Sequence, residues 1–273
     1  MFLHCASLRL DLSRPLVMGI VNVTPDSFSD GGSHFLRDAA IAHAQQLIAE
    51  GADILDIGGE STRPGAQEIS VQEELDRVLP VIESLGAVAV PLSIDTCKAD
   101  VMRAALAAGV HMVNDINALQ QAGALEALAA SGAAVCLMHK QGHPQTMQLE
   151  PQYQDVLFEV MAFLRTRVEA VEAAGIARDR IVVDPGFGFG KTLLHNLTLL
   201  RNLDQFSALG VPLLAGLSRK SMLGSITGQP VDERMAASVA AALIAVQRGA
   251  SIVRVHDVQA TCDALKIWNA VNF

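Results

Sequence analysis

Eight short apolar runs, separated by helix-forming segments, constrain the fold of this chain more than any other feature. The runs are mostly apolar rather than regularly alternating between apolar and polar residues, which is typical of strands that are buried on both faces. Segments with helical spacing lie between them, for example at 39–50, 99–108, 153–174 and 234–248. The predicted strands are 16–21, 54–57, 91–94, 110–113, 134–138, 181–183, 212–217 and 252–255.

Glycines mark the borders of this pattern. Six of them follow a helical segment and precede the next strand by a few residues. A glycine after a helix end commonly takes the left-handed cap conformation, so we expect a positive φ at each. The six are Gly51, Gly109, Gly132, Gly175, Gly210 and Gly249.

Eight strand–helix units over about 250 residues match the size of a (β/α)8 TIM barrel. An open doubly wound sheet is the alternative, but it requires a glycine-rich nucleotide loop after the first strand, and 22–26 is not one. We therefore predict an α/β protein with one barrel domain over 16–273. Residues 1–15 are predicted to form a short strand pair that caps the barrel base.

Composition and charge argue against several classes of protein. The net charge is −9 without a run of Lys and Arg, which argues against a nucleic-acid partner. The longest nearly apolar stretch, 235–246, is shorter than the ~20 residues that span a bilayer. The cysteines Cys5, Cys97, Cys136 and Cys262 form no CxxC pair and no leader precedes them, so we expect free thiols and a cytoplasmic location.

Polar side chains follow all eight predicted strands. In a TIM barrel the C-terminal strand ends form the active-site face. Carboxylates, amides and cations converging there predict a functional mouth rather than a structural one. These residues are Asn22, Asp56, Asp95, Asn114, Asp115, His139, Asp184, Ser218, Arg219, Lys220, Arg254 and His256.

Two familiar motifs are only approximated. Residues 186–192 resemble a phosphate-binding loop, but Pro185 occupies the position of its first glycine. These glycines are instead predicted to form a tight loop that exposes Phe187 or Phe189. Cys136, His139 and His143 have poor spacing for structural zinc.

Eight motifs, at 18–32, 52–66, 93–96, 113–116, 136–139, 184–191, 216–221 and 252–257, closely resemble those of bacterial dihydropteroate synthases. The resemblance covers nearly the whole chain, in order. It implies that the protein joins 6-hydroxymethyl-7,8-dihydropterin diphosphate to 4-aminobenzoate, with Mg²⁺, on a TIM barrel that is a homodimer.

The resemblance also implies a pterin site. Asp184 accepts two neighbouring N–H groups of the ring, Lys220 donates to the ring carbonyl, and Asn114 offers one donor and one acceptor. Asp95 lies at the other nitrogen side of the ring.

The implied diphosphate site uses cations from several loops. Arg254 and His256 alternate along the last strand, so that both side chains can face the same side. Thr62 and Arg63 match family phosphate contacts. Asn22 matches the Mg²⁺ ligand, since an amide oxygen with phosphate oxygens and waters suits this ion.

The implied aminobenzoate pocket lies at the outer side of the mouth. Phe28 could cover the aminobenzoate or merely anchor its loop. The other residues of this pocket are Thr62, Pro64, Phe189, Lys220 and Ser221.

Family chemistry implies early loss of pyrophosphate and an SN1-like pterin-methyl cation. The implied catalytic residues are Asp95, Lys220, Arg254 and His256. Arg254 and His256, with Mg²⁺ and Arg63, would stabilise the departing charge, and Asp95 would stabilise the carbocation. Closure of the loops 23–37 and 60–70 would exclude water from that cation.

Two rival functions remain at this point. A methyltetrahydrofolate-dependent methyltransferase barrel would share the pterin contacts but needs no diphosphate site. A non-catalytic pterin-binding barrel would be expected to lack Asn22, Asp95 or Lys220, all of which are present.

Overall fold

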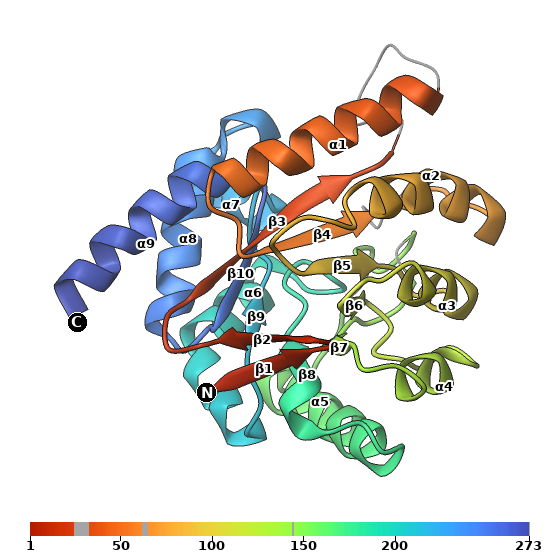
Figure 1. Cartoon of the computed structure of the whole chain (residues 1–273). Coiled ribbons are helices and arrows are strands. Elements are labelled where there is room, and N and C mark those ends of the chain that lie inside the picture. The colour runs from red at the N-terminus through yellow and green to blue at the C-terminus, as the bar shows by residue number, and fades with distance from the viewer. Residues whose placement is uncertain (25–32, 62–64, 144, 273) are drawn as a thin grey trace.

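The computed structural model describes residues 1–24, 33–61, 65–143 and 145–272, and the predicted barrel strands are all present in it. Their bounds are β3 Leu16–Asn22, β4 Ile54–Gly58, β5 Leu92–Asp95, β6 Met112–Asp115, β7 Ala134–Met138, β8 Ile181–Asp184, β9 Leu214–Ala215 and β10 Ile252–Val255. They form one parallel sheet in the order β8-β7-β6-β5-β4-β3-β10-β9, and a bridge between Val183 and Leu213 joins its two ends. The predicted TIM-barrel fold is confirmed (Figure 1).

Several strands continue into the polar residues that were expected just after them. Asn22 pairs with Gly58, Asp95 with Asn114, and Asp184 with Met138. These side chains therefore belong to the last rungs of the sheet, where the backbone ladder fixes their direction. The run predicted at 212–217 is strand only at Leu214–Ala215, because Pro212 has no N–H to donate and the chain turns away after Ala215.

Nine helices of the described chain lie outside the barrel (Figure 1). Local capping explains several starts: Ser70, Asp155 and Thr192 each accept a hydrogen bond from a backbone N–H in the first turn. No helix among the described residues is both long and apolar enough to cross a membrane. The helices are α1 Ser33–Ala49, α2 Val71–Ser84, α3 Ala99–Ala107, α4 Ala124–Ala129, α5 Val156–Ala173, α6 Leu193–Arg201, α7 Ser221–Thr227, α8 Met235–Gln247 and α9 Val258–Asn272.

The strand residues divide into two apolar layers. Leu55, Ile57 and Val113 belong to the layer between the sheet and the helices. Met18 and Met112 belong to a separate layer inside the barrel. This division explains why the strands are apolar throughout, since each residue is buried on one side of the sheet or the other.

The N-terminal hairpin closes the lower end of the interior. β1 (Phe2–Cys5) pairs antiparallel with β2 (Leu8–Asp11), and Leu3 and Cys5 are fully buried in the inner layer. The hairpin lies across the barrel base in Figure 1, so the predicted cap is present. The opposite end, where the polar rungs lie, stays available for a ligand.

The expectation of left-handed glycines is wrong at Gly132. Its φ is not positive, whereas Gly51, Gly109, Gly175, Gly210 and Gly249 all have positive φ. Gly132 contacts the turn of the N-terminal hairpin: its carbonyl accepts a hydrogen bond from the N–H of Ala6 at 2.8 Å. A Cβ on Gly132 would lie 3.4 Å from the Cα of Ala6, which is an ordinary van der Waals contact.

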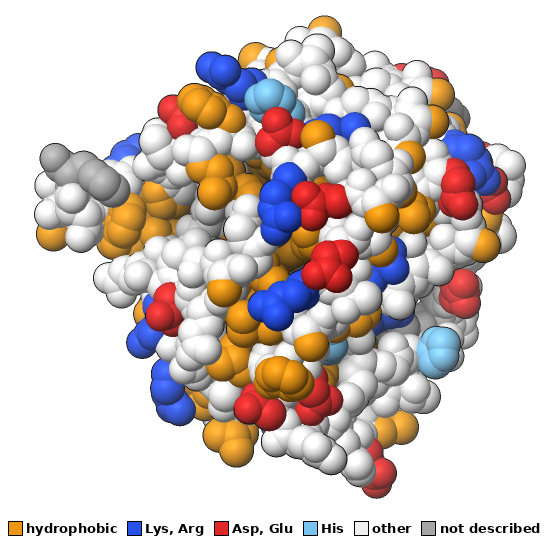
Figure 2. All heavy atoms as spheres, turned by 90° about the horizontal axis from the view of Figure 1, so that it is seen from below, with side chains coloured by type: hydrophobic (Ala, Val, Ile, Leu, Met, Phe, Trp, Pro, Cys, Tyr) orange, Lys and Arg blue, Asp and Glu red, His pale blue; other side chains and the backbone are white. Residues whose placement is uncertain are grey.

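Charges are mixed on the surface that Figure 2 shows. Lys and Arg side chains lie among Asp and Glu side chains on that face rather than in one basic stripe.

Candidate active site

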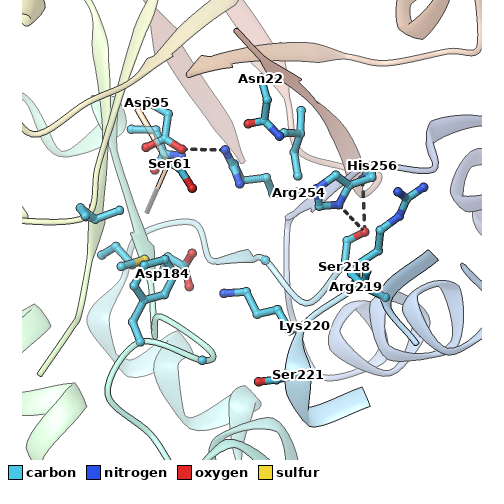
Figure 3. Close-up of a pocket in the computed structure, with 18 of the residues that line it drawn as sticks. Asn22, Ser61, Asp95, Asp184, Ser218, Arg219, Lys220, Ser221, Arg254 and His256 are labelled. Atoms are coloured by element: carbon cyan, nitrogen blue, oxygen red, sulfur yellow. Dashed lines mark hydrogen bonds and ion pairs between the residues drawn. The ribbon is translucent and has the colours of Figure 1, made fainter. Parts of the chain in front are cut away.

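A cavity of about 590 Å³ opens at the C-terminal strand ends. It brings together most of the side chains that the sequence pattern proposed for the site, and Figure 3 shows several of them pointing toward one another. Thr62, Arg63, Pro64 and Phe28 lie outside the described residues. The predicted residues that line the cavity are Asn22, Asp95, Asn114, Asp184, Phe189, Ser218, Arg219, Lys220, Ser221, Arg254 and His256.

Arg254 holds two carboxylates at the floor of the cavity. Its Nε donates to Asp56 Oδ2 at 2.6 Å, and its Nη2 donates to Asp95 Oδ2 at 2.7 Å. Burial raises the pKa of Asp95 to about 7, against the opposing effect of Arg254. Although burial acts against the charged guanidinium, the two carboxylates raise the pKa of Arg254, which stays a cation.

Asp184 and Lys220 form a second charged wall. Asp184 Oδ1 accepts the N–H of Gly186 at 2.7 Å, and Lys220 Nζ donates to the carbonyl of Phe187. Burial raises the pKa of Asp184, with Lys220 as the strongest opposing influence. Burial lowers the pKa of Lys220 to about 8. The wall can therefore both accept and donate hydrogen bonds to a polar ring edge.

The loop after β8 decides which phenylalanine reaches the cavity. Phe187 is fully buried in the outer core, whereas Phe189 lines the cavity. Lys220 Nζ lies 4.5 Å from the centroid of the Phe189 ring, a cation–π distance. The ring thus offers a flat apolar surface next to a cation.

Lys191, the lysine of the segment that resembles a phosphate-binding loop, is buried within its own loop. Its ammonium is only 3% exposed and donates to the carbonyls of Gly186 and Phe189 at 2.9 and 3.1 Å. It also lies 3.0 Å from His139 Nδ1. Burial lowers the pKa of Lys191 to about 7 and that of His139 to about 3. The lysine holds the carbonyls of its own loop, and His139 lies outside the cavity lining.

Replacing Gly186 by alanine is expected to disrupt this loop. A Cβ there would lie 1.8 Å from the carbonyl oxygen of His139, and φ is +72°. The left-handed backbone alone costs an alanine roughly 1–2 kcal/mol, and the clash adds to that cost. Urea denaturation should show a larger loss than for Gly228→Ala, where φ is +75° and nothing lies within 4 Å. Equal losses for the two variants would contradict this account.

Asn22 lies in the cavity lining, and its side-chain oxygen is close to Gly58. A Cβ on Gly58 would lie 3.8 Å from Asn22 Oδ1 and 3.9 Å from Asp95 Oδ2, so both oxygens flank this glycine. Among the described residues, no three His, Cys, Asp or Glu side chains are clustered to hold an ion. Such a donor set fits Mg²⁺, which commonly takes one or two protein oxygens together with substrate phosphates and water.

Asp56 and Asp115 were predicted to lie at the mouth, but neither lines the cavity. Asp56 lies inside β4, and Asp115 is the last residue of β6. Asp115 accepts the N–H groups of Asn117 and Leu119, both at 2.7 Å, and so shapes the loop after β6. The other lining residues were not predicted from the sequence. Only Ile20 could have been, because it lies two residues before Asn22 on the same strand and therefore on the same face. These other lining residues are Ile20, Thr24, Glu60, Ser61, Ile116, Met138, Met147, Gln148, Gly188, Gly216, Val231 and Asp232.

Comparison with known proteins identifies the family to which this chain belongs. Residues 18–256 match the family model described as pterin binding enzyme. The chain belongs to the family of pterin-binding enzymes. It is 52% identical to the dihydropteroate synthase of Haemophilus influenzae and 54% identical to that of Neisseria meningitidis serogroup C. The matches cover 96% of this chain in both cases, with 95% and 94% of those proteins.

Solved structures of the family agree closely with this one. The dihydropteroate synthase of Xanthomonas albilineans with 4-aminobenzoic acid is 56% identical with a TM-score of 0.93, over 99% of this chain and 98% of that one. The Burkholderia cenocepacia dihydropteroate synthase complexed with 7,8-dihydropteroate is 53% identical with a TM-score of 0.91, over 99% and 96%. The resemblance to bacterial dihydropteroate synthases is therefore confirmed.

Proposed function

We propose that this protein is a dihydropteroate synthase, which condenses 6-hydroxymethyl-7,8-dihydropterin diphosphate with 4-aminobenzoate and releases pyrophosphate. One observation carries the proposal. A single cavity holds a wall that can read a polar ring edge, made by Asp184, Lys220 and Asn114, and a cationic wall that includes Arg254 and His256. The high identity to dihydropteroate synthases supports the same conclusion.

The first wall suits the pterin ring. Asp184 keeps lone pairs for two adjacent N–H groups of the ring, while Gly186 takes only one of its acceptor sites. Lys220 donates to the ring carbonyl. With 5% and 6% of Asp184 and Asn114 exposed, an unmatched ring would leave buried polar groups unpaired, at about 1–3 kcal/mol each.

The second wall receives the diphosphate. Arg254 lies on β10 and His256 directly follows this strand, and both line the cavity. Asn22 would hold Mg²⁺ together with phosphate oxygens and water. When bound, this ion supplies positive charge to the leaving group. Thr62 and Arg63 complete the phosphate contacts in this proposal.

The reaction then needs little acid–base chemistry. The C–O bond to the diphosphate breaks, its electron pair leaves with pyrophosphate, and the positive charge spreads over the pterin. Asp95 stabilises that cation electrostatically in its ionised form. The aminobenzoate nitrogen attacks the methylene carbon, and its surplus proton passes to water or to pyrophosphate.

The aminobenzoate occupies the outer part of the mouth in this proposal. Phe189 supplies a face for the aromatic ring, and Lys220 and Ser221 lie beside it in the cavity lining. Pro64 and Thr62 are assigned to the same pocket. We further propose that the protein is a homodimer in the cytoplasm, where its four cysteines would stay reduced.

The test supplies dihydropterin diphosphate, labelled 4-aminobenzoate and Mg²⁺, and measures labelled dihydropteroate and pyrophosphate. Asp184→Asn is expected to raise the Kd for the pterin about 10- to 100-fold, because the neutral amide offers one acceptor oxygen where two are needed. Asp204→Asn, at an exposed carboxylate outside the cavity lining, is the matched control with unchanged kinetics. Absence of product with the wild-type protein would refute the proposed function.

A further inference from the structure

Asp56 lies beneath the cavity and touches two of the residues that line it. Its side chain is fully buried, and it is absent from the cavity lining. One oxygen, Oδ2, accepts hydrogen bonds from Asn114 Nδ2 at 2.8 Å and from Arg254 Nε at 2.6 Å. The donors come from β6 and β10, and β4, which carries Asp56, is separated from each by one strand. A single oxygen thus ties two opposite parts of the barrel interior.

We propose that Asp56 is a positioning residue of the pterin site, which sets the atoms that Asn114 and Arg254 present to the ligand. This inference rests on the proposed function, since it assigns Asp56 to that same site. It concerns the orientation of two side chains rather than any contact with the ligand.

The orientation of Asn114 follows from the chemistry of the carboxylate. An ionised carboxylate only accepts hydrogen bonds, so the NH₂ end of the Asn114 amide must face Asp56. The amide oxygen is then directed elsewhere and can accept a hydrogen bond from a ligand. With the amide reversed, the site would present a second donor at the same place. Asp56 therefore favours a ring edge that carries an N–H group opposite the Asn114 oxygen.

The orientation of Arg254 follows from the same oxygen. Because Nε is bound to Asp56, the plane of the guanidinium is fixed, and Nη2 reaches Asp95 Oδ2 at 2.7 Å. The remaining N–H groups can then face an anion in the cavity. Without Asp56, the long side chain would have one anchor in place of two, and positioning of the leaving group would weaken.

Two buried polar atoms at or next to Asp56 have no hydrogen-bond partner among the described residues. Asp56 Oδ1 and Ser93 Oγ are both buried without a hydrogen-bond partner among the described residues, and they stand at paired positions of β4 and β5. The buried carboxyl group of Asp56 therefore has its hydrogen bonds to Asn114 and Arg254 at one oxygen only. A substitution that removes the acceptor oxygen should change both of those residues together.

The charge of Asp56 supplies a second readout. The charged groups that act on Asp95 are Arg254 on β10, Asp56 on β4, Glu74 on α2, Asp115 on β6 and Lys220 before α7. Asp56 raises the pKa of Asp95, so its neutralisation should lower that pKa. Because Asp95 acts in its ionised form, the acid limb of the kcat profile should move to lower pH.

Two variants separate these effects. Asp56→Asn keeps an acceptor oxygen and removes the charge, so we expect a shift of the acid limb with a small change in KM. Asp56→Leu removes both, and we expect the KM for the pterin diphosphate to rise about 10- to 100-fold with a smaller loss in kcat. Pterin binding without aminobenzoate, followed by fluorescence, should weaken in parallel for Asp56→Leu.

The possible outcomes separate a failure of the positioning role of Asp56 from a failure of the proposed synthase function. If the wild-type protein turns over but both variants keep its KM, its binding and its pH profile, the positioning role is wrong and the function stands. If Asp56→Leu does not fold, an unshifted acid limb in Asp56→Asn overturns the inference by itself. A wild-type protein that neither binds a pterin nor forms product would overturn both.

Discussion

Replacing Arg254 by methionine is expected to abolish turnover and to destabilise the protein in a pH-dependent way. The guanidinium is the shared partner of Asp56 and Asp95. Removing one member of a buried ionic group costs about 3–5 kcal/mol, because the remaining charge is left uncompensated. Loss of an anion contact in the cavity should lower kcat by about 10²–10³-fold or more, and the affinity for pyrophosphate should fall with it.

The pH dependence of this loss has a definite sign. Asp95 already has a folded-state pKa of about 7, well above the value near 4 expected when unfolded. Without Arg254 its pKa rises further, so the variant binds more protons folded than unfolded. Its stability is retained at low pH and falls as the pH rises through the folded pKa. Urea denaturation at pH 5.5 and pH 8 should therefore show the larger deficit at pH 8.

An arginine from an exposed ion pair is the matched control. Arg103 pairs with Asp100 on α3, and both side chains are more than half exposed. Exposed pairs contribute about 0–1 kcal/mol, so Arg103→Met should change neither stability nor kinetics appreciably. An Arg254→Met protein as stable as wild type at both pH values would disprove the shared-clamp account.

Lys98→Met is expected to have the second large effect. Lys98 is buried at the start of α3, and its Nζ donates to Glu60 Oε2 at 2.9 Å and to Glu74 Oε2 at 2.7 Å. Burial disfavours the ammonium, but the two carboxylates outweigh it and raise the pKa of Lys98. Since Glu74 is fully buried, the methionine variant should lose about 3–5 kcal/mol of unfolding free energy.

This triad also holds part of the cavity wall. Glu60 lines the cavity and accepts the N–H of Ile69 at 2.9 Å, which ties the loop after β4 to itself. Lys98→Met should therefore raise KM as well as lower stability. The double variant Lys98→Met/Glu74→Gln removes the fully buried charge and should recover part of the stability. Lys266→Met removes the lysine of an exposed ion pair and is the control. A double variant with a lower unfolding free energy than Lys98→Met would contradict this account.

The strands could be predicted to within one or two residues because a barrel strand is buried on both faces. This requirement leaves short, mostly apolar runs, of which β3 and β7 are the clearest examples. The run with the largest difference is the short β9, where Pro212 removes a donor and the strand covers only Leu214–Ala215. The left-handed conformation predicted for Gly132 was wrong because a glycine after a helix can also adopt a negative φ, which the sequence does not reveal.

The pattern of strand ends predicted part of the candidate site, and the family motifs predicted residues of the loops such as Phe189 and Lys220. Asn22, Asp95 and Asp184 were found from the strand ends, and each lines the cavity. Met147 and Gln148 were missed, since they come from a loop after β7 without a regular pattern. Lys191 was recognised only as part of a motif, because its three polar contacts depend on how the loop folds back.

By itself, the sequence determined the strand–helix alternation, the barrel, the polar strand ends and the family, because each follows from residues close together in the chain. Only the tertiary structure decided how the charges are paired. Arg254 and Asp56 are 198 residues apart in the chain, yet Arg254 Nε lies 2.6 Å from Asp56 Oδ2 inside the closed barrel. Hydrogen bonds act over about 3 Å, so the assignment of Asp56 to Asn114 and Arg254 depends on which strands become neighbours when the barrel closes.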